Sequence, residues 1–305
     1  MPEESSDDVL TRAAGEPPAE EEFPEEVGSG LLRSFLGLFV VPLLVVLLCV
    51  AVFIGFGWIA YDRQATSDYL DDLQSWWKPR RVQAAYELSK ILVADPRALA
   101  EEPGAEAEMR RLFVETRDPE MRQYLALVLG RTRDPAAAPL LISALDDADG
   151  KTRIYAIWAL GALGHPSARE PLERALLSDD AGVRKTAAFA LGELGDRAAV
   201  RALLPRLDDP VPDVRWNAAL ALARLGSDAG VPVLEAMLDR RLLAQVPGIT
   251  PEQQEEAMVS AVRALAAVGG RGALPIFERL AEEEPSLKVR QAAIAARQAA
   301  ARAGR

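Results

Sequence analysis

Cysteine, histidine and aromatic residues are all scarce in this chain of 305 residues. It contains one cysteine, Cys49, and one histidine, His165. A single cysteine excludes an intramolecular disulfide, a cysteine-based zinc site and an iron–sulfur cluster, and a single histidine excludes a multi-histidine metal site. Aromatic residues make up only 6% although half of the chain is hydrophobic. The apolar half is therefore mostly alanine, leucine and valine, which favours helices over sheets.

Motifs for catalysis and phosphate binding are also missing. No cysteine or serine lies at motif spacing from a histidine and an acid, and the patterns GxxxxGK[ST] and GxGxxG do not occur. His165 stands in a turn where later repeats have Asp196 and Ser227, so we expect it to cap a helix or lie at the surface. We therefore expect a protein that is not an enzyme and has no catalytic residues, no metal and no cofactor.

Acidic charge is concentrated at the start of the chain. The net charge is −11, and the segment 1–77 carries fourteen acids and three bases, whereas the remainder is neutral because its acids and bases are equal in number. A neutral domain lacks the basic surface that nucleic-acid binding requires. Nucleic acid is therefore not an expected partner.

The N-terminal third is predicted to contain a tail, a membrane span and a neck. Residues 1–30 carry ten acids and one base, which predicts a disordered tail that is either merely solvated or attracts a basic partner. The run from Ser34 to Tyr61 holds no charged residue and is long enough to cross a hydrocarbon layer of about 30 Å. We expect a single transmembrane helix over 31–61 and a juxtamembrane neck over 62–80.

The orientation of this span depends on a few basic residues. Only Arg33 lies close to its N-terminal side, whereas Arg63, Lys78, Arg80 and Arg81 follow it. The positive-inside rule places the C-terminal domain in the cytoplasm, at the inner or plasma membrane. A periplasmic position remains the alternative because Lys78 to Arg81 lie near the limit of the rule's range.

The remainder, 81–305, is a repeat array. Four segments align without gaps, and their anchor arginines recur at a constant spacing: Arg122, Arg153, Arg184 and Arg215. Three diverged copies begin at Arg81, Met258 and Val289, with insertions near 93–110 and 239–252. Each unit consists of a helix, a short Asp-rich turn and a second helix. Such a unit cannot build a core alone but stacked copies can, which predicts an α-solenoid.

The pattern VRxxAAxALGxLGD, followed by a helix ending in LxDD, resembles the bacterial HEAT repeat, in particular the short type of phycobilisome-lyase-like proteins. The resemblance extends from Arg81 to Gly304 and implies an all-α HEAT-type solenoid of about seven repeats. It also implies that the first helices line a concave surface and the second helices a convex one. The anchor arginines would form a structural ladder between neighbouring repeats, together with the turn acids Asp118, Asp149, Asp180, Asp209 and Asp213.

A row of apolar residues is predicted on the side of the first helices that faces away from the core. At 100° per residue, position +5 from the anchor lies opposite the buried positions. Most copies have an aromatic or aliphatic residue there, and neighbouring positions add further rings. We call the following set the inner stripe: Tyr86, Tyr124, Leu127, Ile154, Tyr155, Trp158, Phe189, Trp216, Leu220 and Arg263.

A contiguous apolar patch of this kind usually marks an interaction site. The sequence therefore predicts a membrane-anchored HEAT-repeat scaffold that binds a protein or peptide partner through its concave face. The stripe could instead pack between adjacent repeats. Two other functions remain open: a chromophore-binding protein similar to phycobilin lyases, because an aromatic groove could hold a tetrapyrrole, or a structural subunit of a membrane complex.

Overall fold

The computed structural model describes residues 40–61, 66–268 and 270–303. The chain divides into two units, with the boundary after Arg63. The predicted acidic tail lies outside the described residues, and so does the start of the predicted transmembrane helix.

The described part of the first unit is helix α2, Val41–Tyr61. Its side chains are exposed from residue 42 to residue 53. Across the part of the chain that is described, no helix is both long enough and apolar enough to cross a membrane. The predicted transmembrane helix is therefore not confirmed.

The second unit is built from pairs of helices, and its described residues contain no strand. The first helices of the pairs are α4 (Lys78–Ala94), α6 (Pro119–Arg131), α8 (Gly150–Leu163), α10 (Ala181–Leu194), α12 (Pro212–Arg224) and α15 (Pro251–Val268). The second helices are α5 (Ala105–Glu115), α7 (Ala137–Ser143), α9 (Arg169–Ala175), α11 (Val200–Leu203), α13 (Val231–Ala236) and α16 (Leu274–Glu283). The remaining helices are α3 (Thr66–Leu73), α14 (Arg240–Leu243) and α17 (Leu287–Ala303). Where about seven repeats were expected, the described residues thus form six pairs and a last helix, α17, which continues the row.

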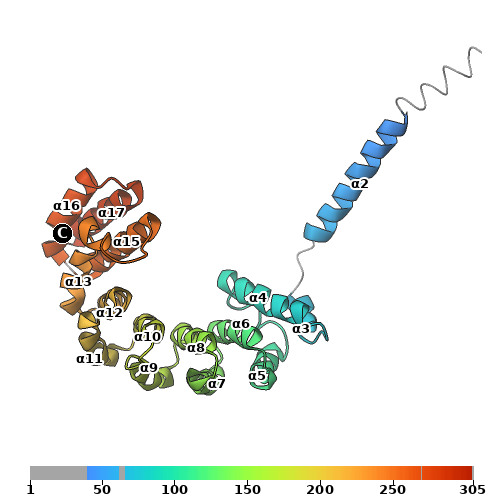
Figure 1. Ribbon diagram of the computed structural model, residues 1–305, viewed down its shortest axis with the longest axis horizontal. Coiled ribbons are helices and arrows are strands. Elements are labelled where there is room, and N and C mark those ends of the chain that lie inside the picture. The colour runs from blue at the N-terminus through green and yellow to red at the C-terminus, as the bar shows by residue number, and fades with distance from the viewer. Residues whose placement is uncertain (1–39, 62–65, 269, 304–305) are drawn as a thin grey trace, which may run out of the picture. The chain divides into compact units, whose positions relative to one another are not determined.

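Two layers of helices form a curved array within this unit (Figure 1). The first helices from α4 to α12 lie on the inner side of the curve and the second helices on its outer side. Along the inner layer α6 packs against α8, α8 against α10, and α10 against α12. The expected assignment of concave and convex helices is confirmed in this part of the array.

The Asp-rich turns begin the inner helices. Asp118, Asp149 and Asp180 occupy the N-cap positions of α6, α8 and α10, and each carboxylate accepts a hydrogen bond from a backbone N–H of the first turn. These bonds satisfy amide groups that have no partner within the helix. Gly164 and Gly195 then end α8 and α10 in the left-handed conformation, with φ of 70° and 74°.

The buried core consists largely of alanine and leucine and forms two clusters. One contains buried residues from Leu73 to Leu225, the other buried residues from Ala219 to Ala296, and α12 contributes to both. The two clusters therefore meet at α12, where the regular spacing of the repeats ends.

The two insertions have different structures. The first holds the end of α4, a turn region and the start of α5, whereas the second holds α14 and the loop before α15. Thr250 caps α15: its hydroxyl accepts from the Gln253 N–H (3.2 Å), and the Gln253 side chain accepts from the Thr250 N–H (2.9 Å).

Candidate functional site

The inner stripe lies on the first helices, and most of its side chains are half-buried. Tyr86 is 39% exposed and Arg263 is exposed, whereas the other eight residues are intermediate. Trp158, Tyr155 and Trp216 pack against the two core clusters with part of their surface. The stripe is thus neither a fully exposed patch nor a core packed away between repeats, the two alternatives that the sequence left open.

Aromatic rings of neighbouring repeats meet at the N-terminal end of the stripe. Tyr86 on α4 and Tyr124 on α6 make an edge-to-face contact with 5.4 Å between ring centroids. The ammonium of Lys90 lies 5.1 Å from the Tyr86 centroid and also pairs with Glu87. The rings are thereby held in one orientation while Tyr86 stays accessible.

Arginines cover the rings in the middle of the stripe. The guanidinium of Arg131, at the end of α6, lies 4.5 Å from the Trp158 centroid on α8. The guanidinium of Arg224, at the end of α12, lies 5.2 Å from the Phe189 centroid on α10 and pairs with Glu193 at 2.5 Å. The sequence analysis missed these arginines, although both occupy position +9 from their anchors and a helical wheel places that position on the same face.

At the C-terminal end the second insertion lies beside the stripe. A cavity of 420 Å³ is lined by Trp216 and Leu220 of α12, by residues 246–249 of the insertion and by the first turns of α15. Arg263 lines a neighbouring cavity together with Leu220 and Arg224. Residues 246–249 of the insertion therefore form one wall of the cavity beside Trp216. Arg263 faces the cavity between α12 and α15.

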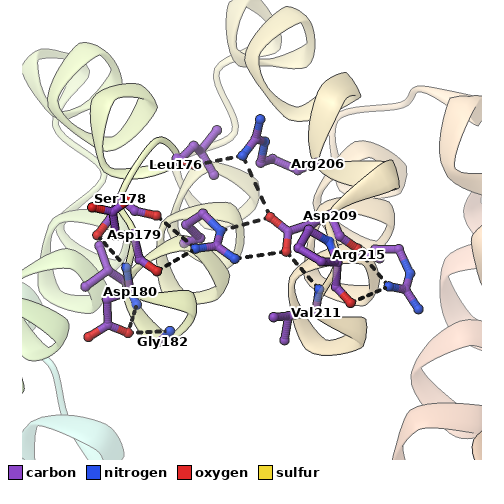
Figure 2. A network of polar contacts seen from close by, with 12 residues as sticks. Leu176, Ser178, Asp179, Asp180, Gly182, Arg206, Asp209, Val211 and Arg215 are labelled. Carbon is purple, nitrogen blue, oxygen red and sulfur yellow. Dashed lines mark hydrogen bonds and ion pairs between the residues drawn. The ribbon is translucent and has the colours of Figure 1, made fainter.

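The expected ladder is present at Arg184. This side chain makes two hydrogen bonds to Asp209 at the end of its own repeat, Nε to Oδ2 at 2.9 Å and Nη2 to Oδ1 at 3.1 Å. It also donates to the carbonyl oxygens of Ser178, which ends the preceding repeat, and of Asp179, and so links the two repeats. Figure 2 shows Asp209 at the centre of this network, where it also accepts from the Val211 N–H. The bonds from Arg184 hold the pKa of the Asp209 carboxyl below its usual value.

The other anchors differ in their side-chain partners. Arg122 pairs with Asp147 at the end of its own repeat at 2.7 Å, and it donates to the Phe113 carbonyl of the preceding repeat at 2.8 Å. Arg153 and Arg215 instead bond only to backbone carbonyls before their own helices, of Asp147 at 2.8 Å and of Asp209 at 2.7 Å. Asp147 and Asp209 end the preceding repeats, so these two anchors also link neighbouring repeats as expected, but through backbone carbonyls alone. They lack a carboxylate partner because the positions that correspond to Asp147 and Asp209 hold Ser178 and Arg240 in their own repeats.

The turn acids provide further links between repeats. Asp118 pairs with Lys78 at 2.8 Å, and Asp213 pairs with Lys185 at 3.1 Å. Asp149 accepts a hydrogen bond from the Gln123 amide at 2.9 Å. Asp180, in contrast, caps its own helix. These contacts stabilise the array and leave no carboxylate poised for chemistry among these turns.

No reactive cluster accompanies the stripe. The described residues contain no group of three or more His, Cys, Asp or Glu side chains that could hold a metal ion. His165 caps the 3-10 turn that begins at Pro166, where its Nδ1 accepts from the Ser167 N–H at 3.3 Å. The inner stripe thus presents a row of aromatic rings with cations beside them.

Comparison with known proteins supports the repeat assignment. A profile of the family of HEAT repeats matches residues 108–189 and 178–245. These matches cover the regular block of repeats and support a HEAT-repeat protein. No curated protein matches the chain.

Solved structures of repeat proteins resemble the chain at low sequence identity. A chain from the complex of CpcE and CpcF of phycocyanin lyase from Nostoc sp. PCC7120 is 20% identical, with a TM-score of 0.53, over 78% of this chain and 95% of that one. A designed armadillo repeat protein in complex with the peptide (KR)4 is 19% identical, with a TM-score of 0.43, over 77% of this chain and 99% of that one. The first of these similarities shows the α-solenoid fold.

Proposed function

We propose that this protein is a membrane-anchored scaffold without enzymatic activity, which binds a protein or peptide segment on its inner stripe. The observation that carries the proposal is the row of rings on α4, α6, α8 and α10, half-buried except for the exposed Tyr86, each held by the core or by a neighbouring cation. Rings fixed in this way lose little conformational entropy when a partner binds. Aromatic and arginine side chains also dominate binding hot spots.

Assembly with a second protein is in keeping with this proposal. A solenoid of similar fold is found in the Nostoc complex of CpcE and CpcF. The described residues hold no cluster suited to metal chemistry, and the polar contacts near the stripe are internal ion pairs and caps. Binding is therefore the function that this surface supports best.

Membrane attachment is the second part of the proposal. The uncharged run of residues 34–61 supports it, and so do Trp76 and Trp77, which are 90% and 55% exposed at the start of the second unit. Exposed tryptophans close to an apolar segment suit the membrane–water interface. The basic residues that follow the run favour a cytoplasmic position for the repeats.

Photo-crosslinking in cells tests the binding proposal. A photoreactive amino acid at position 189 lies on the stripe, and the same group at position 201, an exposed site on α11, serves as the matched control. We expect a discrete protein adduct from position 189 alone. Equal labelling from both positions, or none from position 189, would contradict a binding site on the inner stripe.

A chromophore-binding protein is the alternative, supported by the fold that the chain shares with a phycocyanin-lyase structure. It predicts that the purified protein retains a pigment or gains an absorbance band with a linear tetrapyrrole. Replacing Trp158 by alanine should then abolish that band. A colourless protein with no spectral change would exclude this alternative.

A further inference from the structure

One position of the repeat, the ninth after each anchor, places a row of residues at the ends of the inner helices. From α4 to α12 it reads Lys90, Arg131, Ala162, Glu193 and Arg224. Two of the three cations have a carboxylate partner: Lys90 pairs with Glu87 at 3.0 Å, and Arg224 pairs with Glu193 at 2.5 Å. The third cation, Arg131, differs.

Arg131 has no carboxylate partner among the described residues. Its side chain is half-buried, and its guanidinium lies over the Trp158 ring. Burial lowers the pKa of this guanidinium, and no nearby acid opposes that effect. A cation that has lost water without gaining an anion is costly, so Arg131 favours the binding of a carboxylate that accepts hydrogen bonds from its guanidinium.

The repeat shows where that carboxylate would lie. On α10 and α12 the two adjacent ninth positions form the pair Glu193–Arg224, which covers Phe189. On α6 and α8 the two adjacent ninth positions hold Arg131 and Ala162, so the arginine is here on the earlier helix rather than on the later one. Neither neighbour of Arg131 in this row, Lys90 or Ala162, is an acid. Ala162 is exposed, so an external side chain can approach Arg131 from that side.

We propose that Arg131 and Trp158 form a subsite for an aspartate or glutamate side chain of an extended segment of a partner protein, with an adjacent apolar residue on the stripe. This inference rests on the proposed function and names the chemistry of its partner. A charge-assisted hydrogen bond from the guanidinium to the carboxylate gives the subsite its preference for acid over amide.

Binding of defined peptides to the full chain in lipid nanodiscs tests the subsite. The probe is a fluorescein-labelled peptide with four Phe-Glu repeats, compared by anisotropy with its Phe-Gln and Phe-Lys counterparts. We expect the Phe-Glu peptide to bind about tenfold or more tightly than the Phe-Gln peptide. Arg131→Gln should abolish this preference.

Ala162→Glu provides a sharper variant because it leaves Arg131 in place. The new glutamate should pair with Arg131 as Glu193 pairs with Arg224, and so lower the affinity for the Phe-Glu peptide to that for the Phe-Gln peptide. Ala162→Gln adds the same bulk without the charge and should retain the preference. Since position 162 is exposed, neither change should impair folding.

The outcomes separate this inference from the proposed function. Equal affinity for all three peptides, a preference for Phe-Lys, or an unchanged preference in Ala162→Glu would overturn the acidic subsite while leaving a binding stripe intact. Binding of none of the peptides would also overturn it. Crosslinking from position 189 would then decide whether the proposed function fails as well.

Discussion

Single glycines determine how closely the inner helices approach one another. A Cβ atom on Gly130, Gly161 or Gly192 would lie 2.6 to 2.8 Å from the Cα of an alanine in the next inner helix. Real Cβ atoms do not come so close to backbone. The small residues are therefore required by the spacing of the repeats.

Gly161→Ala is expected to destabilise the protein by about 1–3 kcal/mol, because the added methyl group meets the Ala190 backbone at 2.7 Å. Urea denaturation followed by tryptophan fluorescence would measure the change. Alanine normally stabilises a helix by about 1 kcal/mol relative to glycine. A more stable variant would therefore show that the helices are not in close contact here.

The Arg184–Asp209 pair should make stability depend on pH. Because the pKa of Asp209 is lowered in the folded state, its contribution is present above the unfolded value of about 3.9 and is lost as the pH falls through the folded value. Asp209→Asn should cost about 3 kcal/mol at pH 7. The difference between variant and wild type should shrink below about pH 4.

Denaturation curves at pH 7, 5 and 3.5 would test this pH dependence. Asp180→Asn serves as the control, because Asp180 caps its own helix and asparagine is also a good cap. A loss in Asp209→Asn that stays the same at every pH would contradict the role of the ion pair.

The sequence contains enough to place the ladder, but not the ring contacts. Asp147 and Asp209 follow Arg122 and Arg184 at the same spacing, so the two anchors with a carboxylate partner and the two without one could have been read from the repeat alignment. The contact between Arg131 and Trp158 depends on the conformation of two long side chains on different helices. No repeat pattern specifies such conformations.

At the scale of the secondary-structure elements, helix α14 of the second insertion is held to the C-terminal helices by an ion pair. Arg240 of α14 bonds to Glu284, in the turn between α16 and α17, with 2.8 Å from Nε to Oε1. The Glu284 side chain is only 6% exposed and also accepts from the Ser286 N–H. The insertion thereby connects the end of α13 to the last two helices.

Arg240→Gln should therefore weaken the C-terminal helices selectively, since it leaves the buried Glu284 carboxylate without its cation. Hydrogen exchange would measure this effect as lost amide protection in α15 to α17. Protection in α6 to α10 should stay unchanged. A uniform loss over the whole array would contradict a local role for this pair.

Helix positions were more predictable than the contacts of irregular segments. The repeat period and the Asp-rich turns place the helices of the regular block close to their observed bounds. For example, α8 and α10 each begin directly after a turn acid, Asp149 and Asp180. The position of residues 246–249 beside Trp216 could not be predicted, because a loop's path depends on packing rather than on periodicity.

At the scale of the whole molecule, the glycine–alanine contacts between neighbouring inner helices are alike from α6 to α12. One complete repeat should therefore be dispensable. Removing the segment 153–183 joins Thr152 to Arg184 and replaces one glycine–alanine contact by an equivalent one, because the deletion is one period long. Circular dichroism should show the same helical signal per residue and cooperative unfolding. Removing only the segment 156–183, which is shorter than one period, shifts the pattern out of phase and should abolish folding.

The glycine contacts also indicate where such a protein can grow. A tandem duplication of one repeat-length segment before α12 would add an inner helix that makes the same glycine–alanine contacts with both of its neighbours. The array could therefore lengthen without compensating substitutions. After α12 this no longer holds, because Ala223 occupies the place of the glycine and the insertion follows it. The regular block is thus the part in which gene duplication can add binding positions one helix at a time, while the C-terminal helices act as a fixed end.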